Sequence, residues 1–245
     1  MLGVVPARGG SKRVPRKNIR NVAGKPLIAH TVEQAIRTDL FEKVVVSTDD
    51  DEIADIAEQY GASVPFKRPE ALATDDASTD AVVSHALDWF EDRGSTFDAV
   101  CVLQVTSPLR SDSDVCGAVE KFAGRNAGTL VSVTEYQSPP QFALEMYDDG
   151  TLGERFDPEM VFSDQYVRSQ DLDTLYCPNG AIYIADTDTW DQYERFYTPE
   201  TVGYEMPPER AIDIDHPWEI DVVECLLGDE SNPEPGCQDE SNAPS

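Results

Sequence analysis

Short apolar runs alternate with segments of helical periodicity along most of the chain, and this alternation constrains the fold more than any other feature. The apolar runs predict strands at residues 2–5, 43–48, 63–66, 99–104, 128–133 and 181–184. The periodic segments predict helices at residues 27–38, 51–60, 79–90, 113–122 and 217–227. Strands that alternate with helices are typical of an α/β fold, in which helices cover both faces of a Rossmann-like, mainly parallel sheet.

The net charge of the 245-residue chain is -28, from 47 acidic and 19 basic side chains. Nucleic-acid binding that ignores sequence needs a basic surface, so this composition argues against a nucleic-acid partner. Abundant carboxylates suit a high-salt cytoplasm, where counterions screen their repulsion, and we expect a halophilic source. No apolar run approaches the roughly 20 residues of a membrane span, and residues 1–25 lack a signal-peptide core. We therefore expect a cytoplasmic protein with no membrane partner.

Basic residues are concentrated at the start of the chain, where no acidic residue occurs before Glu33. The basic residues before that position are Arg8, Lys12, Arg13, Arg16, Lys17, Arg20 and Lys25. In so acidic a chain, such a cluster predicts a site for a polyanion. A solvated N-terminal arm is the alternative, but the glycines and apolar residues within the cluster favour a folded binding site.

The first predicted strand runs directly into a loop that contains Gly9 and Gly10. Glycine lets the backbone approach a ligand closely, and successive backbone N–H groups form a concave anion site. The side chains that could reach the same anion are Arg8, Lys12, Arg16, Lys17 and Lys25. The loop matches neither the Gly-x-x-x-x-Gly-Lys-Ser/Thr pattern nor the Gly-x-Gly-x-x-Gly pattern. It therefore predicts a nucleoside-triphosphate site of another kind.

Two carboxylates, Asp213 and Asp215, lie two positions apart near the end of the chain. In an extended segment such residues point to the same side, so both can converge on one site. Hard oxygen ligands beside a triphosphate favour Mg²⁺. Because Asp-x-Asp is common by chance among 47 acidic residues, the metal site is predicted only together with the basic loop.

Regular periodicity is lost over residues 136–170, which contain a Pro-Pro pair and an Asp-Asp-Gly turn. We expect this segment to leave the sheet as a hairpin arm that packs on a second subunit in a homodimer. Residues 228–245 hold five carboxylates, three prolines and no basic residue. Such a composition predicts a disordered acidic tail, which would follow a single catalytic domain over residues 1–227.

Five motifs, in order along the chain, resemble those of the acylneuraminate cytidylyltransferases, the CMP-sialic acid synthetases. The first is VPARGGSKRVPRKNI at residues 5–19, followed by GKPL at 24–27. The others are RPEALATDDAST at 68–79, LQVTSPLR at 103–110, RSQDL at 168–172 with NGAIY at 179–183, and IDID at 212–215. The resemblance covers roughly residues 2–227 and implies a sheet of the nucleotide-diphospho-sugar transferase type.

This resemblance implies that CTP and a nine-carbon 2-keto acid sugar react to give a CMP-sugar and pyrophosphate, with Mg²⁺ as cofactor. The residues implied for the nucleotide are Ala7, Arg8, Gly9, Gly10, Ser11, Lys12, Asn18, Arg68, Ser78 and Thr79. Those implied for the acceptor sugar are Gln104, Ser107 and Arg168. The implied catalytic residues are Lys17, Asp213 and Asp215, with both aspartates on the metal and Asp215 favoured over Asp213 as the base.

Two other functions stay open at this point. A cytidylyltransferase for the eight-carbon acid Kdo, or another sugar nucleotidyltransferase, would have a similar first loop. A catalytically silent homologue could instead bind nucleotide as a regulator, although it would not need Asp213 and Asp215. Among nonulosonic acids, the sequence does not distinguish N-acetylneuraminic, legionaminic and pseudaminic acid.

The charge of -28 predicts that salt stabilises the folded protein, because counterions screen the repulsion between its carboxylates. We expect the midpoint of thermal unfolding to rise steadily as KCl is raised from low to molar concentration, as followed by circular dichroism. A midpoint that does not change, or that falls as KCl rises, would contradict adaptation to high salt.

Overall fold

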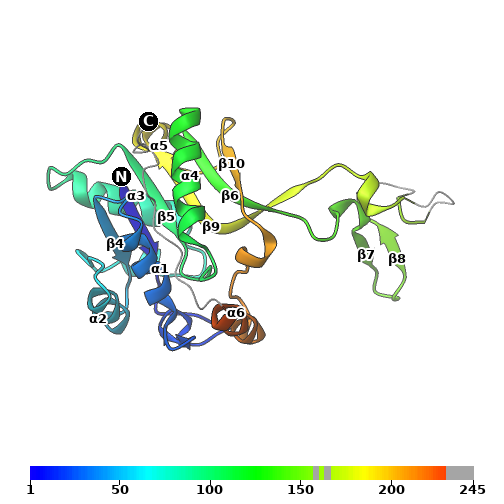
Figure 1. Ribbon diagram of the computed structural model, residues 1–245, viewed down its shortest axis with the longest axis horizontal. Coiled ribbons are helices and arrows are strands. Elements are labelled where there is room, and N and C mark those ends of the chain that lie inside the picture. The colour runs from blue at the N-terminus through cyan, green and yellow to red at the C-terminus, as the bar shows by residue number, and fades with distance from the viewer. Residues whose placement is uncertain (157–159, 163–166, 230–245) are drawn as a thin grey trace, which may run out of the picture.

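A computed structural model describes residues 1–156, 160–162 and 167–229 and contains a six-stranded central sheet (Figure 1). Its strands are β1 (Leu2–Pro6), β4 (Lys43–Ser47), β5 (Ala99–Leu103), β6 (Thr129–Glu135), β9 (Tyr176–Asp186) and β10 (Val202–Glu205). Their order across the sheet is β10-β6-β9-β5-β1-β4. Only β9 is antiparallel to its neighbours, β5 and β6, so the predicted mainly parallel α/β sheet is confirmed.

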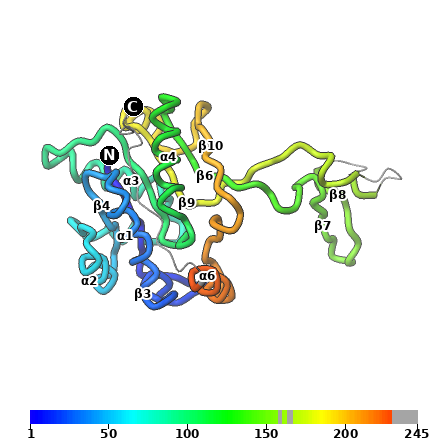
Figure 2. Tube along the Cα trace, in the orientation of Figure 1, coloured from blue at the N-terminus to red at the C-terminus, as the bar shows by residue number. Residues whose placement is uncertain are grey.

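Helices cover both faces of the sheet, as predicted (Figure 2). One face packs against α1 (Leu27–Arg37), α2 (Asp51–Gln59), α4 (Asp112–Arg125) and α6 (Pro217–Asp229). The other face packs against α3 (Thr79–Glu91) and α5 (Thr187–Tyr193). Adjacent strand residues serve opposite faces: Val5 joins the first cluster and Val4 the second, and both are fully buried. This two-sided burial explains why the strands read as continuous apolar runs.

Local signals set the ends of several helices. The Asp50 carboxylate accepts from the backbone N–H groups of Glu52 and Ile53, both at 3.0 Å, and so caps the start of α2. Gly61 follows the end of α2 with a φ of 97°, a backbone conformation that favours glycine. Ser111 and Asp114 form a capping box at the start of α4.

The strand predicted over residues 63–66 does not form. Ser63 makes a single parallel bridge to Val45 at the edge of the sheet. Pro65 follows two residues later, and proline has no N–H to continue a ladder. The segment therefore runs along the edge strand β4 without becoming a seventh strand.

Other elements were not predicted from the sequence, notably α5, β10 and the full length of β9. The predicted strand over 181–184 is the buried centre of the 11-residue strand β9. Strand β10 pairs in parallel with β6 at the edge of the sheet, and its residues are alternately half-buried and exposed. The chain also makes a small hairpin from β2 (Asn21–Val22) and β3 (Lys25–Pro26).

Beyond the sheet, β6 and β9 continue as an antiparallel pair, with Glu135 opposite Tyr176. They lead into a hairpin of β7 (Leu144–Met146) and β8 (Leu152–Glu154). Figure 1 shows that this segment, which we call the arm, projects well away from the body. The hairpin excursion predicted over 136–170 is therefore present.

Helix α6 continues to Asp229, two residues beyond the predicted end of the catalytic domain at residue 227. Residues 230–245, the rest of that tail, lie outside the described residues. In the described part of the chain, no helix is both long and apolar enough to cross a bilayer.

Candidate active site

A cavity of about 250 Å³ lies where β1 and β5 end, at their carboxyl edge. In open α/β sheets this edge is where ligands bind. The predicted site residues that line it are Arg8, Gly10, Ser11, Lys17, Asn18, Arg68, Ser78, Thr79 and Gln104. Lys12 lines an adjoining hollow that shares Arg8, Gly10 and Ser11 with the cavity. The structure thus brings most of the predicted nucleotide residues to one place.

The two loop glycines have different roles in the ligand-free protein. The Gly9 N–H donates to Asp49 Oδ1 at 2.9 Å, and a Cβ at Gly9 would lie 2.7 Å from Asp50 Oδ2. Packing against the acidic turn therefore leaves no room for a side chain at position 9. No atom lies within 4 Å of a Cβ built at Gly10, so the backbone is open there. Of the two glycines, only Gly10 lines the cavity.

Arg8 and Lys12 both contact the carboxylate of Asp75. Arg8 Nη2 lies 2.8 Å from Asp75 Oδ1, and Arg8 Nη1 donates to the Thr74 carbonyl at 2.7 Å. The Lys12 ammonium, followed by the charge of Arg8, lowers the pKa of Asp75. A carboxylate thus lies between the two cations that were predicted to hold phosphate. Asp75 belongs to the 68–79 motif, but the sequence did not single it out.

Two other cations of the basic cluster do not reach the cavity. Arg16 Nη1 pairs with Asp50 at 2.7 Å and its Nη2 pairs with Glu52. Lys25 pairs with Glu33 on α1. The expectation that Arg16 and Lys25 reach the same anion is therefore wrong for this structure, because nearby carboxylates of α1 and α2 hold them.

Lys17 connects the N-terminal loop to the predicted carboxylate pair. Its Nζ donates to the Ile214 carbonyl at 2.6 Å and lies 3.3 Å from Asp215 Oδ1. Arg13 Nη1 donates to the other oxygen of Asp215 at 2.9 Å. Residues that are 198 positions apart in the sequence therefore meet, as the prediction of a joint site requires.

Backbone contacts hold the 213–215 segment in place. The Ile214 side chain is fully buried, and its N–H donates to the Thr106 carbonyl at 2.8 Å. The N–H groups of Asp215 and His216 donate to Glu219 at 2.5 and 2.6 Å. Glu219 therefore caps α6 and sets the direction in which the segment enters the helix.

Asp213 lies beside this cluster in a different electrostatic environment. Its side chain still reaches solvent, but surrounding protein partly desolvates the carboxyl and raises its pKa, and the charge of Asp215 adds to the rise. The Thr106 hydroxyl and Lys17 oppose the shift. Two carboxylates with different environments therefore lie next to Lys17 of the basic N-terminal loop.

Arg68 and Asn18 line the cavity while holding its walls. The Arg68 Nε donates to Ser47 Oγ at 3.1 Å, and burial lowers the pKa of its guanidinium to about 10. The Asn18 amide donates to the Arg8 carbonyl at 2.9 Å. These donors already have protein partners, so both residues shape the site whether or not they touch a ligand.

The remaining predicted residues are divided. The Ser78 hydroxyl caps α3, and Gln104 Nε2 donates across the cavity to Thr79 Oγ1 at 3.4 Å. Seven predicted residues do not line the cavity itself, namely Ala7, Gly9, Lys12, Ser107, Arg168, Asp213 and Asp215. Ala7 and Ser107 are buried, and Arg168 is exposed at the start of a short 3-10 helix, η4 (Ser169–Asp171), in the arm.

Aromatic residues near Asp213 were not predicted from the sequence. The ring centroids of Tyr183 on β9 and Tyr197 lie 6.4 Å apart, in an edge-to-face arrangement. Burial raises the pKa of both, and the charge of Asp213 contributes to the shift of Tyr183. Tyr183 is the last residue of the NGAIY motif. That motif is the sequence signal that could have identified the tyrosine as a site residue.

The fold and the site together define a nucleotidyltransferase. A cation-lined cavity at the carboxyl edge of a mainly parallel sheet opens beside a carboxylate pair, which is what transfer of a nucleotidyl group from a triphosphate requires. Comparison of the sequence with protein families gives the same answer: the profile described as cytidylyltransferase matches residues 2–198. The chain belongs to the cytidylyltransferase family.

Individual relatives agree with this assignment. The chain is 36% identical over 225 residues to a pseudaminic acid cytidylyltransferase of Campylobacter jejuni, covering 92% of this chain and 95% of that protein. It is 39% identical over 230 residues to a CMP-N,N'-diacetyllegionaminic acid synthase of Legionella pneumophila, covering 93% and 96%.

A solved structure shares the fold. It is a CMP:2-keto-3-deoxy-manno-octonic acid synthetase in complex with CTP, with a TM-score of 0.65 and 18% identity, covering 93% of this chain and 98% of that one.

The environment of Asp213 predicts an unusual effect of its removal on stability. A carboxyl whose pKa is raised by folding binds more protons when folded, so stability falls as pH rises through that window. Asp213→Asn should therefore raise the thermal unfolding midpoint at pH 7, with a gain that shrinks as pH approaches the ordinary carboxyl value of 3.8.

Asp215→Asn is the matched control, because it removes the contacts with Lys17 and Arg13 and should not stabilise the protein. If Asp213→Asn is less stable than the wild-type protein at pH 7, the ionised Asp213 carboxylate does not destabilise the folded state.

Proposed function

We propose that the protein transfers CMP from CTP to the anomeric hydroxyl of a nonulosonic acid and releases pyrophosphate. The contact of Lys17 with Asp215 is the observation that supports this reaction most, because it joins a phosphate loop to a carboxylate pair. Family membership supports CTP as the donor, and the two relatives support an acidic sugar as the acceptor. The proposal names a class of acid, since the relatives are named for different members of it.

The triphosphate would take the place that Asp75 now has between Arg8 and Lys12. The arginine offers a planar pair of donors to phosphate oxygens, and the 83% exposed lysine offers a mobile charge. The open backbone at Gly10 leaves room for the phosphates to approach. Ser78 and Thr79 would then face the nucleoside from the start of α3.

Mg²⁺ would be held by Asp213 and Asp215 together with phosphate oxygens and water. The described residues contain no group of three or more His, Cys, Asp or Glu side chains that could hold a metal by themselves. This donor set fits Mg²⁺, which commonly binds one or two carboxylates plus substrate phosphates. When bound, the ion would neutralise charge on the phosphoryl and leaving oxygens.

The protein's own residues would orient the reactants and move one proton. The anomeric hydroxyl attacks the α-phosphorus, the bond to pyrophosphate breaks, and the hydroxyl proton passes to a carboxylate. Asp215 pairs with Arg13 and Lys17, whereas Asp213 forms no ion pair among the described residues, so its carboxylate is the freer of the two to accept the proton. We therefore favour Asp213 as the base, in contrast to the preference for Asp215 drawn from the sequence.

A homodimer would complete the acceptor side of the site. Among the described residues, most of the exposed large apolar side chains lie on the arm, including Met146 at 76%, Phe156 at 64% and Phe162 at 58% exposure. A monomer seldom exposes so many apolar side chains together, so a second copy of the chain is the proposed partner. Arg168, which does not line the cavity of its own chain, would reach the acceptor carboxylate in that second copy.

We further propose that the protein works in a salt-rich cytoplasm, on the basis of its charge of -28. A catalytically silent nucleotide-binding regulator is the alternative of another class. The contact between Lys17 and Asp215 argues against a regulator, because a protein that only binds a nucleotide does not need a carboxylate paired with that lysine.

Pyrophosphate release at high KCl tests the proposed reaction. With Mg²⁺ and a panel of N-acetylneuraminic, legionaminic and pseudaminic acids, CTP should support turnover with at least one acid, and other nucleotides should not. Asp213→Asn should lower kcat by about a hundredfold or more, in line with loss of a general base. Release of no pyrophosphate with any acid, despite CTP binding, would favour the regulator. Near-normal turnover of Asp213→Asn would remove its role as base.

Mixing two inactive variants tests the dimer. Light scattering should give twice the chain mass of 27.1 kDa. Arg168→Ala and Asp215→Asn should each lose activity, and the mixed dimer should recover part of it, because one subunit supplies the carboxylate and the other the arginine. A monomeric mass, or a mixture no more active than its components, would contradict the shared site.

A further inference from the structure

Arg110 is a buried cation next to the cavity that the proposed reaction does not use. The residue is 3% exposed, and burial lowers the pKa of its guanidinium to about 10, so it remains charged near neutral pH. Among the described residues it has no ion-pair partner. Its hydrogen-bond acceptors are the side chains of Gln34 and Thr31 and the carbonyls of Gln104 and Ala181.

Such an arrangement is costly for stability alone. A buried charge loses its hydration, and apolar residues of similar volume often replace buried ions without loss of stability. Arginine nevertheless holds this position with a fork of donors, each aimed at a neutral oxygen at 2.8 to 3.3 Å. An arginine at position 110 is therefore better explained by a role in fixing the positions of neighbouring groups than by a contribution to stability.

The acceptors of Arg110 show what that task is. Gln104 begins the loop that leads from β5 to α4 and Arg110 lies near its end, and Arg110 Nη1 reaches back 3.2 Å to the Gln104 carbonyl. The same nitrogen donates to the Ala181 carbonyl on β9 at 2.9 Å. The direct ladder contact there, from Gln104 N–H to the Ala181 carbonyl, is long at 3.4 Å. The guanidinium therefore links the start of the β5–α4 loop to β9 at the point where the hydrogen bond between β5 and β9 is long.

We propose that Arg110 is a positioning residue for the transfer reaction, which sets the placement of the Gln104 side chain toward the acceptor sugar. This proposal rests on the proposed role of Gln104 in acceptor binding. The Gln104 carboxamide reaches Thr79 across the cavity, so a shift of its backbone moves the carboxamide within the site. Because buried polar networks are rigid when all their members are bonded, Arg110 restricts that shift.

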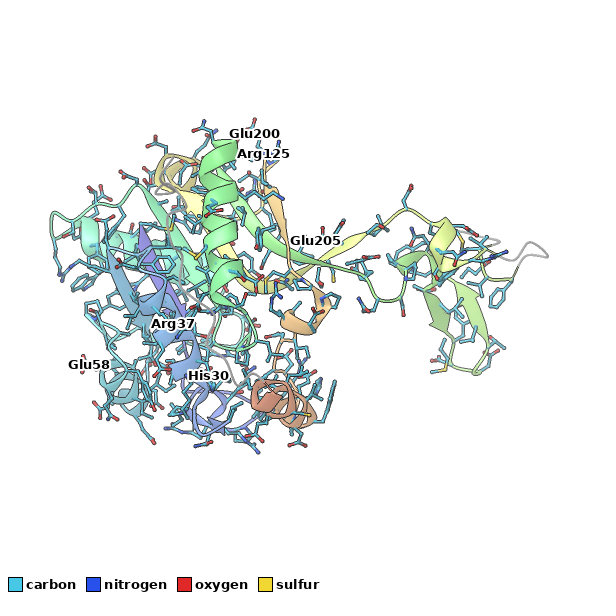
Figure 3. The ribbon with its side chains drawn as sticks, in the orientation of Figure 1. His30, Arg37, Glu58, Arg125, Glu200 and Glu205 are labelled. Atoms are coloured by element: carbon cyan, nitrogen blue, oxygen red, sulfur yellow. The ribbon has the colours of Figure 1, made fainter. Side chains whose placement is uncertain are left out.

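The network behind Arg110 provides a matched control. Gln34 also donates to Asp112, and Asp112 pairs with Arg37, labelled in Figure 3, whose side chain is 49% exposed. Arg37→Met breaks this outer pair without touching the Gln104 carbonyl. It should lower the thermal unfolding midpoint and leave the KM for the acceptor unchanged.

A double-mutant cycle in steady-state kinetics tests the proposal, with the nonulosonic acid that gives the highest rate. Arg110→Lys keeps the charge but loses the fork, and should raise the KM for the acceptor about tenfold with little change in the KM for CTP. In a Gln104→Ala background, Arg110→Lys should have no further effect on the acceptor KM. If Arg110→Lys does not fold, Gln34→Met replaces it, since it removes the acceptor of the guanidinium Nε.

Two results would overturn the inference while leaving the proposed function intact. One is that Arg110→Lys raises the acceptor KM by the same factor in the wild-type and Gln104→Ala backgrounds. The other is that Arg37→Met raises the acceptor KM as much as Arg110→Lys does. If Gln104→Ala alone leaves the acceptor KM unchanged, Gln104 does not bind the acceptor. The inference about Arg110 then fails as well.

Discussion

The contact between Lys17 and the 213–215 segment is the interaction on which the rest of the site depends. The ammonium donates to the Ile214 carbonyl and pairs with Asp215, and the lysine side chain is only 13% exposed. A partly buried ion pair is screened by salt less than a surface pair, which matters for a chain with a charge of -28. Through this contact the phosphate loop at one end of the chain and the carboxylates at the other become parts of one site.

Two carboxylates contact the basic N-terminal loop at the residues proposed to bind phosphate. Asp75 lies between Arg8 and Lys12, and Asp49 accepts from the Gly9 N–H. Exposed ion pairs of this kind contribute about 1 kcal/mol or less, so a triphosphate with several charges can displace Asp75. Asp75 also fixes the positions of Arg8 and Lys12, in a protein where acidic residues greatly outnumber basic ones.

The sequence predicts most clearly those features that depend on local pattern. Buried strands are apolar on both faces, and the glycine loop follows the first of them, so the fold class and the place of the loop beside a cavity were both predictable. Features set by distant partners were not. Gly9 is required because Asp50 packs against it, and Arg16 is diverted to the same carboxylate. The placement of Arg168 in the arm, and the half-exposed edge strand β10, depend likewise on the assembled fold.

The effect of Mg²⁺ on CTP binding tests the central claim, that the basic loop and the carboxylate pair act as one site. Calorimetric titration of CTP into the wild-type protein should give tighter binding with Mg²⁺ than without it. In Asp213→Asn and Asp215→Asn, CTP should still bind, because the loop is intact, but Mg²⁺ should no longer strengthen binding. Equal strengthening by Mg²⁺ in the wild-type protein and in both variants would contradict the account.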